Sequence, residues 1–287
     1  MKRSDFRFME RLRVRWAEID AQQIVFNSHY LMYFDTAVAG YWRALALPYT
    51  QTMEYLGGDL FVRKATVEYE GSARYDDVLD VGMRSSRIGN SSMVFAAAVF
   101  RADQLLVKGE LVYVFADAAT QSSKPVPQEL RDVLQSFEAG KSMLEVRLGN
   151  WAELGSAAHS IRMAVFVQEQ NIPADREWDE ADTDVGCVHA VAYNRFGLPL
   201  ATGRLLEHVP GVAKIGRMAV VQAMRGGGVG RAVLDALMSA GRESGYREAV
   251  LHAQTSAAPF YRRAGFVERG PVFDEVGIPH VEMVRSL

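Results

Sequence analysis

The chain has 287 residues, of which 49% are hydrophobic and 23% are charged, a globular composition with enough apolar residues to fill two cores. A formal net charge of −3 provides no global basic field, which argues against nucleic acid as a partner. The single cysteine, Cys187, excludes an internal disulfide, and no segment reaches the roughly 18 consecutive apolar residues of a membrane span. We therefore expect a cytoplasmic protein of two domains.

The first half of the chain predicts one long helix followed by a meander of strands. Residues 12–16 alternate apolar and charged side chains, as a half-buried strand does, and Asp20 follows directly. Apolar residues three and four apart predict a helix over residues 28–47, with Asn27 or Ser28 as its N-cap. Strand patterns follow at residues 61–70, 78–88, 92–101 and 105–115. Such an order implies an antiparallel sheet wrapped around the helix.

A linker divides the chain near its middle. Helical spacing over residues 130–137 is interrupted at residues 138–142, and a strand pattern restarts at residues 144–148. We place the boundary at residue 141, which predicts domains of residues 1–141 and 142–287. The halves share no repeat of fixed period, so we expect two unlike units and not a duplication.

The second half of the chain predicts a mixed α/β unit. Helical spacing covers residues 151–170, a second helix runs to about Glu243, and a short one spans residues 257–263. Strand patterns suit residues 188–193, 200–206, 214–221, 248–253 and 281–284. Strands and helices that alternate in this way predict a sheet with helices packed on it.

A glycine-rich turn, Arg-Gly-Gly-Gly-Val-Gly-Arg at residues 225–231, separates a predicted strand from a predicted helix. Such a turn directs backbone N–H groups outward at the positive end of a helix dipole, which is a phosphate-binding geometry. A P-loop requires lysine followed by serine or threonine where Arg231 and Ala232 stand. A dinucleotide fingerprint requires glycine where Val233 stands, so both motifs are excluded.

The remaining pattern, R-x-x-G-x-G at Arg225, Gly228 and Gly230, resembles the pyrophosphate loop of the GNAT superfamily of acetyl-CoA-dependent acetyltransferases. The surrounding segments resemble the ElaA/YjcF-like branch: residues 162–170, 217–220, 251–254, 260–266 and 277–281. This resemblance covers about residues 144–286. It implies a mixed sheet flanked by helices and acetyl transfer from acetyl-CoA to an amine, with coenzyme A as a substrate and no metal.

The GNAT resemblance also implies roles for individual residues. Met218 and Val220 would bind pantetheine and the acetyl carbonyl, and Tyr261 would protonate the departing thiolate as general acid. The pyrophosphate would be held by Arg225, Gly226, Gly227, Gly228, Val229, Gly230 and Arg231. Candidates for the general base are Glu169, His252 and His280. For these three, the alternatives are a surface charge, a hydrogen-bonded core histidine and a strand-edge residue, respectively.

An acidic cluster lies between the first helix and the first long strand of this half. Its members are Glu177, Asp179, Glu180, Asp182 and Asp184. No histidine or cysteine stands at ligand spacing, so we expect a solvated loop and no metal site. A remaining possibility is that part of the cluster lines the acceptor cleft and attracts a cationic amine.

The first half carries a second resemblance. Residues 15–20 (RWAEID), 24–27, 75–79 and 124–127 are similar to hotdog-fold acyl-CoA thioesterases of the 4-hydroxybenzoyl-CoA thioesterase type, the YbgC/FadM-like enzymes, over about residues 8–138. The resemblance implies that Asp20 is the catalytic carboxylate, as nucleophile or as base. Backbone N–H groups around Asn27 would polarise the carbonyl. Gln23 stands where the family usually has glycine, which leaves a different loop path open, and Asp20 could instead cap the following turn.

Together the two halves predict a hotdog domain fused to a GNAT domain. The predicted function is a bifunctional enzyme that hydrolyses acyl-CoA thioesters and acetylates a small-molecule amine. We expect a homodimer or higher homo-oligomer through the hotdog domain. Three alternatives remain: the hotdog domain is a non-catalytic acyl-CoA sensor, it is an oligomerisation scaffold, or the second domain is an autoinducer-synthase-like acyltransferase, which Arg162, Phe166 and Trp178 loosely echo.

Overall fold

The computed structural model describes residues 1–275 and 277–287. It divides into two compact units, Met1–Met143 and Leu144–Leu287. The division therefore falls two residues after the predicted boundary at residue 141. Among the described residues, no helix has both the length and the apolar character required to cross a membrane.

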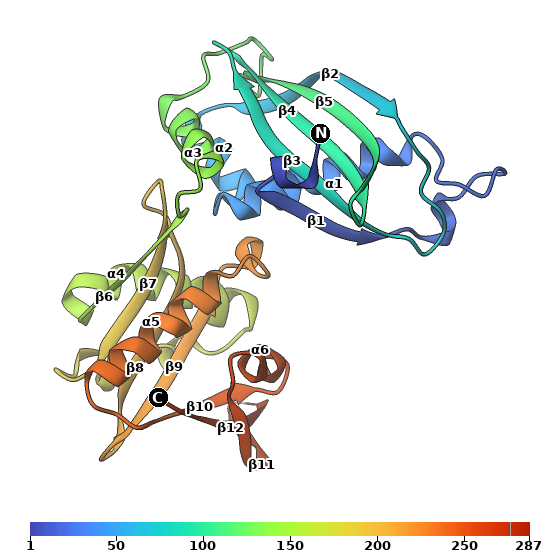
Figure 1. The fold of residues 1–287 in the computed structure, drawn as a ribbon. Coiled ribbons are helices and arrows are strands. Elements are labelled where there is room, and N and C mark those ends of the chain that lie inside the picture. The colour runs from blue at the N-terminus through green and yellow to red at the C-terminus, as the bar shows by residue number, and fades with distance from the viewer. Residues whose placement is uncertain (276) are drawn as a thin grey trace. The chain divides into compact units, whose positions relative to one another are not determined.

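The first unit is a five-stranded antiparallel sheet that curls around one helix (Figure 1). The strand order is β1-β3-β4-β5-β2. The strands are β1 (Phe8–Arg13), β2 (Asp59–Tyr69), β3 (Val78–Ile88), β4 (Ser92–Arg101) and β5 (Gln104–Ala116). The helix, α1 (His29–Ala44), buries Phe34, Ala37 and Tyr41 completely. The predicted antiparallel sheet around a central helix is confirmed.

Close packing brings α1 against the sheet. A Cβ atom at Gly109 of β5 would lie 2.4 Å from the ring of Phe34, so only glycine permits this approach. The predicted helix over residues 28–47 is longer than α1, which ends at Ala44. After Pro48 a second helix follows, α2 (Tyr49–Leu56), which was not predicted. A third helix, α3 (Gln128–Glu138), completes the unit.

The second unit is a seven-stranded mixed sheet in the order β11-β12-β10-β9-β8-β7-β6. The strands are β6 (Leu144–Gly149), β7 (Val188–Asn194), β8 (Pro199–Val209), β9 (Val212–Val220), β10 (Glu248–Gln254), β11 (Val267–Glu275) and β12 (Ile278–Ser286). The helices are α4 (Trp151–Arg162), α5 (Val229–Glu243) and α6 (Ala258–Arg263). Short 3-10 helices are η1 (Arg3–Asp5), η2 (Trp16–Glu18), η4 (Ala174–Arg176), η5 (Glu180–Thr183) and η6 (Gln222–Met224).

Helices cover both faces of this sheet. Val191 of β7 packs with α4 residues in one apolar cluster. Its neighbour Ala190 pairs with Gly203 of β8, over which Val233 and Leu237 of α5 lie. Because successive strand residues point to opposite faces, α4 and α5 lie on opposite sides. The predicted mixed sheet flanked by helices is confirmed.

Two elements of the second unit differ from their predictions. The predicted helix over residues 151–170 is α4 continued by a π-helical segment, η3 (Met163–Glu169). The strand β11 was missed, because Gly270 and Pro271 interrupt its pattern and its pairing with β12 breaks between Arg269 and Phe273. Proline is tolerated at such an irregular edge strand, since it costs no ladder hydrogen bond there.

The neighbouring strands β9 and β10 are parallel but pair only briefly. Their register covers residues 248–250 of β10 against residues 212–214 of β9. Beyond this point both strands continue, β9 to Val220 and β10 to Gln254, without pairing to each other. The sheet is therefore split between β10 and its central strand β9.

Candidate functional site

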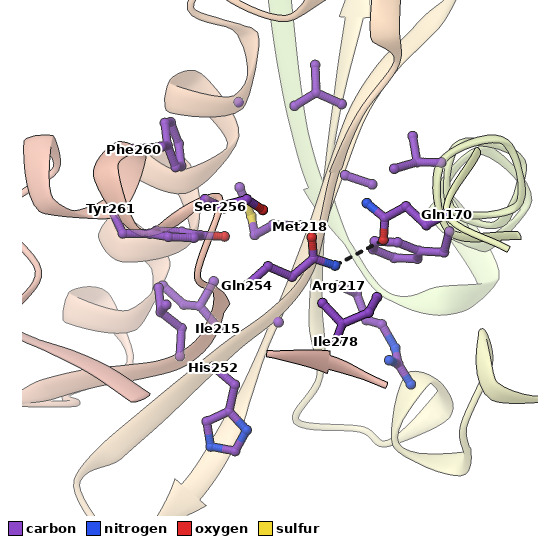
Figure 2. A pocket seen from close by; sticks show the side chains of 18 of the residues that line it. Gln170, Ile215, Arg217, Met218, His252, Gln254, Ser256, Phe260, Tyr261 and Ile278 are labelled. Carbon is purple, nitrogen blue, oxygen red and sulfur yellow. Dashed lines mark hydrogen bonds between the residues drawn. The ribbon is translucent and has the colours of Figure 1, made fainter. Parts of the chain in front are cut away.

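A cavity of about 960 Å³ lies in the second unit where β9 and β10 part (Figure 2). Its walls include residues 215–220 of β9 and Leu251, His252 and Gln254 of β10. The strand β9 bulges here, because its register with β8 shifts between Thr202 and Arg204 and Arg217 adopts a left-handed φ of 53°. A bulge removes backbone groups from the ladder. Backbone as well as side chains can therefore contact a ligand in this cavity.

The glycine-rich turn lines the same cavity. Gly226 and Gly228 have φ values of 81° and 83°, a left-handed conformation that only glycine adopts without strain. The helix α5 begins within the turn, at Val229, and its N-cap Gly228 offers no side-chain cap. Within the described part of the chain, the N–H groups of Gly228, Val229 and Gly230 have no protein acceptor. The turn thus presents unpaired donors at the positive end of a helix dipole.

Carboxylates hold both arginines of the turn. The guanidinium of Arg225 donates two hydrogen bonds of 2.6 Å to the carboxylate of Glu169, and its Nε donates to the carbonyl of Val220 at 3.1 Å. Hydrogen bonding by Arg225 lowers the pKa of Glu169 below its ordinary value. Arg231 donates from Nε to both carboxylate oxygens of Asp235, at 2.9 and 2.8 Å.

The ring of Tyr261 is buried against two phenylalanines, and its hydroxyl points into the cavity (Figure 2). Its ring contacts Phe260 and Phe266 edge to face, at centroid distances of 4.9 and 6.0 Å. Burial raises the pKa of Tyr261 well above its ordinary value. The hydroxyl therefore stays protonated at any physiological pH and is available as a proton donor.

Two histidines lie on another part of the cavity wall. His252 Nδ1 is 3.5 Å from a carboxylate oxygen of Glu275, while burial and the charge of Lys214 lower the pKa of His252. Its imidazole is therefore neutral near pH 7 and can accept a proton. Nδ1 of His280 lies 2.8 Å from the backbone oxygen of Ile278, so that nitrogen is occupied by a hydrogen bond to the main chain.

A pair of glutamine amides spans part of the cavity. Gln254 Nε2 donates to Gln170 Oε1 at 3.0 Å, a bond that Figure 2 draws between the end of β10 and the residue after η3. In the described structure, the side-chain Oε1 of Gln254 and the side-chain Nε2 of Gln170 have no protein partner. The pair can therefore donate to a ligand and accept from it.

A smaller cavity of about 440 Å³ lies in the first unit beside the start of α1. It is lined by residues 20–22 and 24–27 together with Tyr30, Tyr69, Gly71 and Ser72. Asp20 Oδ1 accepts the backbone N–H of Gln22 at 2.8 Å, which leaves the other carboxylate oxygen without a protein partner in the described residues. The N–H groups of Asn27 and Ser28, at the start of α1, likewise lack a protein acceptor there. Of these residues, Asp20 and Asn27 line the cavity, and Ser28 does not.

The loop that carries Asp20 includes a residue in a strained conformation. Gln23 has a φ of 60°, which is the left-handed region that glycine favours. Its N–H donates to the carbonyl of Asp20 at 3.0 Å, and the Asp20 N–H donates to the carbonyl of Ile24 at 2.9 Å. Glutamine at this position therefore accepts the backbone conformation that suits glycine, at a cost of order 1 kcal/mol.

The buried carboxylate of Glu18 holds the loop that carries Asp20 in place. Glu18 is 3% exposed and accepts hydrogen bonds from the backbone N–H of Arg15 at 2.8 Å and from the hydroxyl of Tyr33 at 2.7 Å. Burial alone would raise the pKa of Glu18, but the bonds from Arg15 and Tyr33 outweigh it and lower that pKa. The carboxylate thus ties the segment before Asp20 to α1.

Two family models match the chain. The model described as Acetyltransferase (GNAT) domain matches residues 193–287, and the model described as Thioesterase-like superfamily matches residues 14–134.

Individual relatives divide between the two halves in the same way. The uncharacterized N-acetyltransferase YjcF of Bacillus subtilis is 36% identical over 130 residues, which are 45% of this chain and 90% of the relative. Protein ElaA of Escherichia coli is 32% identical over 131 residues, 44% of this chain and 84% of the relative. A protein of Aquifex aeolicus named "Putative esterase" is 30% identical over 128 residues, 45% of this chain and 98% of the relative.

The chain belongs to both families. Its first unit is a thioesterase-like hotdog domain, and its second unit is a GNAT domain with ElaA/YjcF-like relatives, as both resemblances predicted. These families act on thioesters of coenzyme A.

The predicted site residues of the GNAT domain gather around one cavity with one exception. The cavity is lined by Met218, Val220, Arg225, Gly226, Gly228, Val229, Gly230, Arg231 and Tyr261, and by the base candidates Glu169, His252 and His280. Gly227 does not line it. In the hotdog domain, both Asp20 and Asn27 line the smaller cavity.

The prediction that the acidic cluster forms a solvated loop is wrong for its central members. Glu177 and Asp182 are 1% and 0% exposed. Arg162, itself fully buried, contacts Glu177 at 2.5 Å and Asp182 at 2.8 Å. Arg204 donates to Asp182 at 2.7 Å and to Asp179 at 2.6 Å. Because these carboxylates neutralise buried arginines, they do not give the cleft a net negative charge.

Three structural features of the GNAT cavity were not predicted from the sequence. They are the Gln170–Gln254 amide pair, the backbone bulge at Arg217 and the bidentate pairing of Glu169 with Arg225. Gln170 and Gln254 both stand in segments that carry the GNAT resemblance. This location was the only sequence signal that could have marked them as residues of the site. Their contact joins residues 84 positions apart and has no local sequence signature.

Proposed function

We propose that the GNAT domain transfers the acetyl group of acetyl-CoA to a small-molecule amine. The observation that supports this most is the shared cavity of the glycine-rich turn and Tyr261. The unpaired N–H groups of the turn, with Arg225 and Arg231, would bind the pyrophosphate. The backbone of Met218 and Val220 would bind pantetheine and the acetyl carbonyl in the gap between β9 and β10.

The cavity side chains suit the two proton transfers of this reaction. The amine nitrogen attacks the thioester carbonyl carbon, forming the C–N bond, and the C–S bond then breaks with its electron pair on sulfur. Tyr261 protonates the thiolate, because its raised pKa keeps the proton available. His252 accepts the proton of the amine, since its lowered pKa keeps it neutral. Glu169 is a poorer base because Arg225 engages both of its oxygens.

An acetyl-CoA consumption assay over a panel of amines tests this proposal. The Tyr261→Phe variant should lose about 100-fold or more in kcat, as removal of a general acid does, and keep its Kd for acetyl-CoA. Tyr246→Phe, which removes a hydroxyl outside the cavity, is the matched control. Lactone formation from S-adenosylmethionine and an acyl donor, without amine acetylation, would support the autoinducer-synthase alternative instead.

We propose that the hotdog domain hydrolyses an acyl-CoA thioester with Asp20 as its catalytic carboxylate. The supporting observation is that Asp20 and Asn27, whose N–H group has no protein acceptor among the described residues, line one cavity. The anchored Oδ1 orients the carboxylate. Its other oxygen either attacks the carbonyl carbon, forming an anhydride that water then hydrolyses, or removes a proton from a water molecule that attacks the carbonyl carbon. The N–H group of Asn27 stabilises the oxyanion, and the C–S bond breaks to release the CoA thiolate.

Hydrolysis of a panel of acyl-CoAs tests the second proposal. Asp20→Asn should lower kcat by about 100-fold or more. Trapping an anhydride between Asp20 and the acyl group by rapid quenching would establish the nucleophilic role, because general-base catalysis forms no covalent intermediate. Undiminished hydrolysis by Asp20→Asn would exclude Asp20 as catalyst. Acyl-CoA binding without hydrolysis would support the sensor alternative, and the absence of both would support the scaffold.

We also propose that the chain forms a homo-oligomer through the hotdog domain. The strand β2 lies at the edge of its sheet over Asp59–Tyr69, so one row of its backbone groups has no neighbouring strand in the described chain. Such an edge is a template for pairing with another chain. Sedimentation equilibrium of the full chain measures the stoichiometry, and a monomer at all concentrations would contradict the proposal.

A further inference from the structure

Two aromatic side chains of the hotdog domain, Trp16 and Tyr75, pack against each other on its surface. They are 70% and 53% exposed, and their ring centroids are 5.3 Å apart at an interplanar angle of 83°. The two rings contact each other and so form an exposed aromatic patch, and apolar patches indicate a ligand or contact site more strongly than single exposed side chains do. The edge-to-face arrangement keeps ring surface open to solvent, where a flat ligand can stack.

The aromatic pair lies on the two segments that build the Asp20 cavity. The segment that contains Trp16 continues directly into Asp20, and the segment that contains Tyr75 begins with the cavity residues Gly71 and Ser72. Backbone hydrogen bonds join these segments on both sides of the pair: Val14 N–H to the Asp77 carbonyl at 2.9 Å, and Val25 N–H to the Ala73 carbonyl at 2.9 Å. Four residues span at most about 14 Å, so Trp16 lies within that distance of Asp20.

Exposed arginines surround the pair. The side chains of Arg13 and Arg15 are 61% and 71% exposed, although each also contacts one carboxylate, Asp76 and Glu18 respectively. Arg74 is exposed, and its side chain has no acidic partner among the described residues. Guanidinium groups bind phosphate oxygens in a bidentate manner, and aromatic rings stack on nucleobases.

We propose that Trp16, Tyr75 and Arg74 form a subsite for the nucleotide end of the acyl-CoA thioester. The adenine stacks on the aromatic pair, and Arg74 binds the phosphate groups with help from Arg15. The extended pantetheine arm then spans the distance from this surface to the thioester at Asp20. The assignment of the ligand rests on the proposed function of the hotdog domain, and it adds a nucleotide site distinct from that of the GNAT domain.

Hydrolysis of two thioesters by the full chain tests the subsite. One substrate is an acyl-CoA, and the other carries the same acyl group on N-acetylcysteamine, which lacks the nucleotide. Trp16→Ala and Arg74→Ala should each raise KM for the acyl-CoA by about five- to tenfold, the order expected for one stacked base or one phosphate contact. Neither variant should change KM for the short thioester. Equal changes for both substrates, or none, would overturn the proposal.

Two control variants remove similar side chains elsewhere in the hotdog domain. Tyr55→Ala removes an aromatic ring that is 58% exposed on α2, and Arg43→Ala removes an exposed arginine of α1. Both should leave KM for the acyl-CoA unchanged. A rise in KM with Tyr55→Ala or Arg43→Ala equal to that with the subsite variants would indicate a general surface effect and overturn the assignment.

Binding stoichiometry separates the subsite from the proposed hydrolysis. Isothermal titration of the full chain with coenzyme A should give two sites per chain, and Trp16→Ala should weaken one of them about five- to tenfold. Two sites in a wild-type protein that hydrolyses no acyl-CoA would contradict the proposed hydrolysis and support the subsite. One coenzyme A site in the wild type would overturn the subsite. A change in sedimentation coefficient with Trp16→Ala would also overturn it, because it would show that Trp16 belongs to a contact between subunits.

Discussion

Arg225 and Glu169 form a bidentate ion pair across the GNAT cavity, with both N···O distances at 2.6 Å. The arginine belongs to the turn that we assign to the pyrophosphate, and the carboxylate ends η3. Any phosphate that binds Arg225 must therefore compete with a carboxylate already in place. The pair is partly exposed, with side-chain exposures of 41% and 34%, so water screens it and its strength is modest.

The first prediction concerns this competition. Glu169→Gln removes the competing charge and should tighten coenzyme A binding about two- to fivefold, corresponding to about 0.5–1 kcal/mol. Isothermal titration measures the change. Glu268→Gln, which breaks a carboxylate pair with Arg262 outside the cavity, should have no effect. Weaker binding by Glu169→Gln would instead mean that the carboxylate positions Arg225 for the ligand.

The second prediction concerns the pH dependence of acetyl transfer. If His252 is the base, activity falls as the pH drops through its pKa, which lies below the ordinary value of about 6.5. Lys214→Ala removes a positive charge that disfavours protonated His252, so the acid limb of kcat/KM should move to higher pH. Glu275→Gln removes a negative charge that favours it, so that limb should move to lower pH. Shifts in the same direction would exclude His252 as the titrating group.

The third prediction concerns the buried charges behind the cavity. Burial alone would raise the pKa of Asp182, but hydrogen bonds from Arg162 and Arg204 outweigh it and lower that pKa to about 2. Asp182→Asn leaves two arginines short of a buried partner and should lower the free energy of unfolding by about 3–5 kcal/mol. Urea denaturation measures this loss, and Glu180→Gln at an exposed member of the acidic cluster should cost almost nothing.

The contacts of Asp182 with Arg162 and Arg204 also make the stability of the fold depend on pH in the acid range. The depressed pKa of folded Asp182 means that its contribution is fully present above the unfolded value of about 4. That contribution is lost as the pH falls from about 4 toward about 2, where the folded carboxyl group takes up its proton. In the Asp182→Asn variant, the fall of stability across this window should be shallower than in the wild type, and an identical fall would contradict the role assigned to Asp182.

The fourth prediction concerns the loop of Asp20. Gln23→Gly relieves a left-handed residue and should raise the free energy of unfolding by up to about 1 kcal/mol, since relief of strain outweighs the added freedom of the unfolded chain. Gln22→Gly is the matched control, because Gln22 is not left-handed, and it should lower stability by about 0.4–1 kcal/mol. Equal losses for both variants would show that no strain is stored at Gln23.

Local sequence patterns predicted most of the regular elements, although the strand expected at residues 12–16 is β1 (Phe8–Arg13), displaced toward the N-terminus. The strand patterns at residues 78–88 and 92–101 coincide with β3 and β4, because apolar runs bounded by turn residues are local signals. The π-helical segment η3 was read as part of a longer helix, because it keeps a helix-like apolar spacing. The edge strand β11 was not predicted, because Gly270 and Pro271 are residues typical of a turn and interrupt its strand pattern.

The site was predictable where a motif is contiguous and not where it depends on distant pairs. The residues of the turn at 225–231 stand together in the sequence, so their joint location followed from the pattern. The contacts of Glu169 with Arg225 and of Arg204 with Asp182 join residues 56 and 22 positions apart. Nothing local distinguishes these carboxylates from solvated ones, which is why the acidic cluster was assigned to the surface.

The separation of β9 from β10 has a consequence for how the GNAT domain can evolve. The walls of the gap include peptide groups, which every residue except proline supplies in the same form. Under the proposed function, donor recognition would then survive most substitutions along these strands. The choice of acceptor would depend on side chains such as Gln170 and His252, which can change one at a time. A single scaffold could thus diverge in the amines it modifies while its donor stays the same.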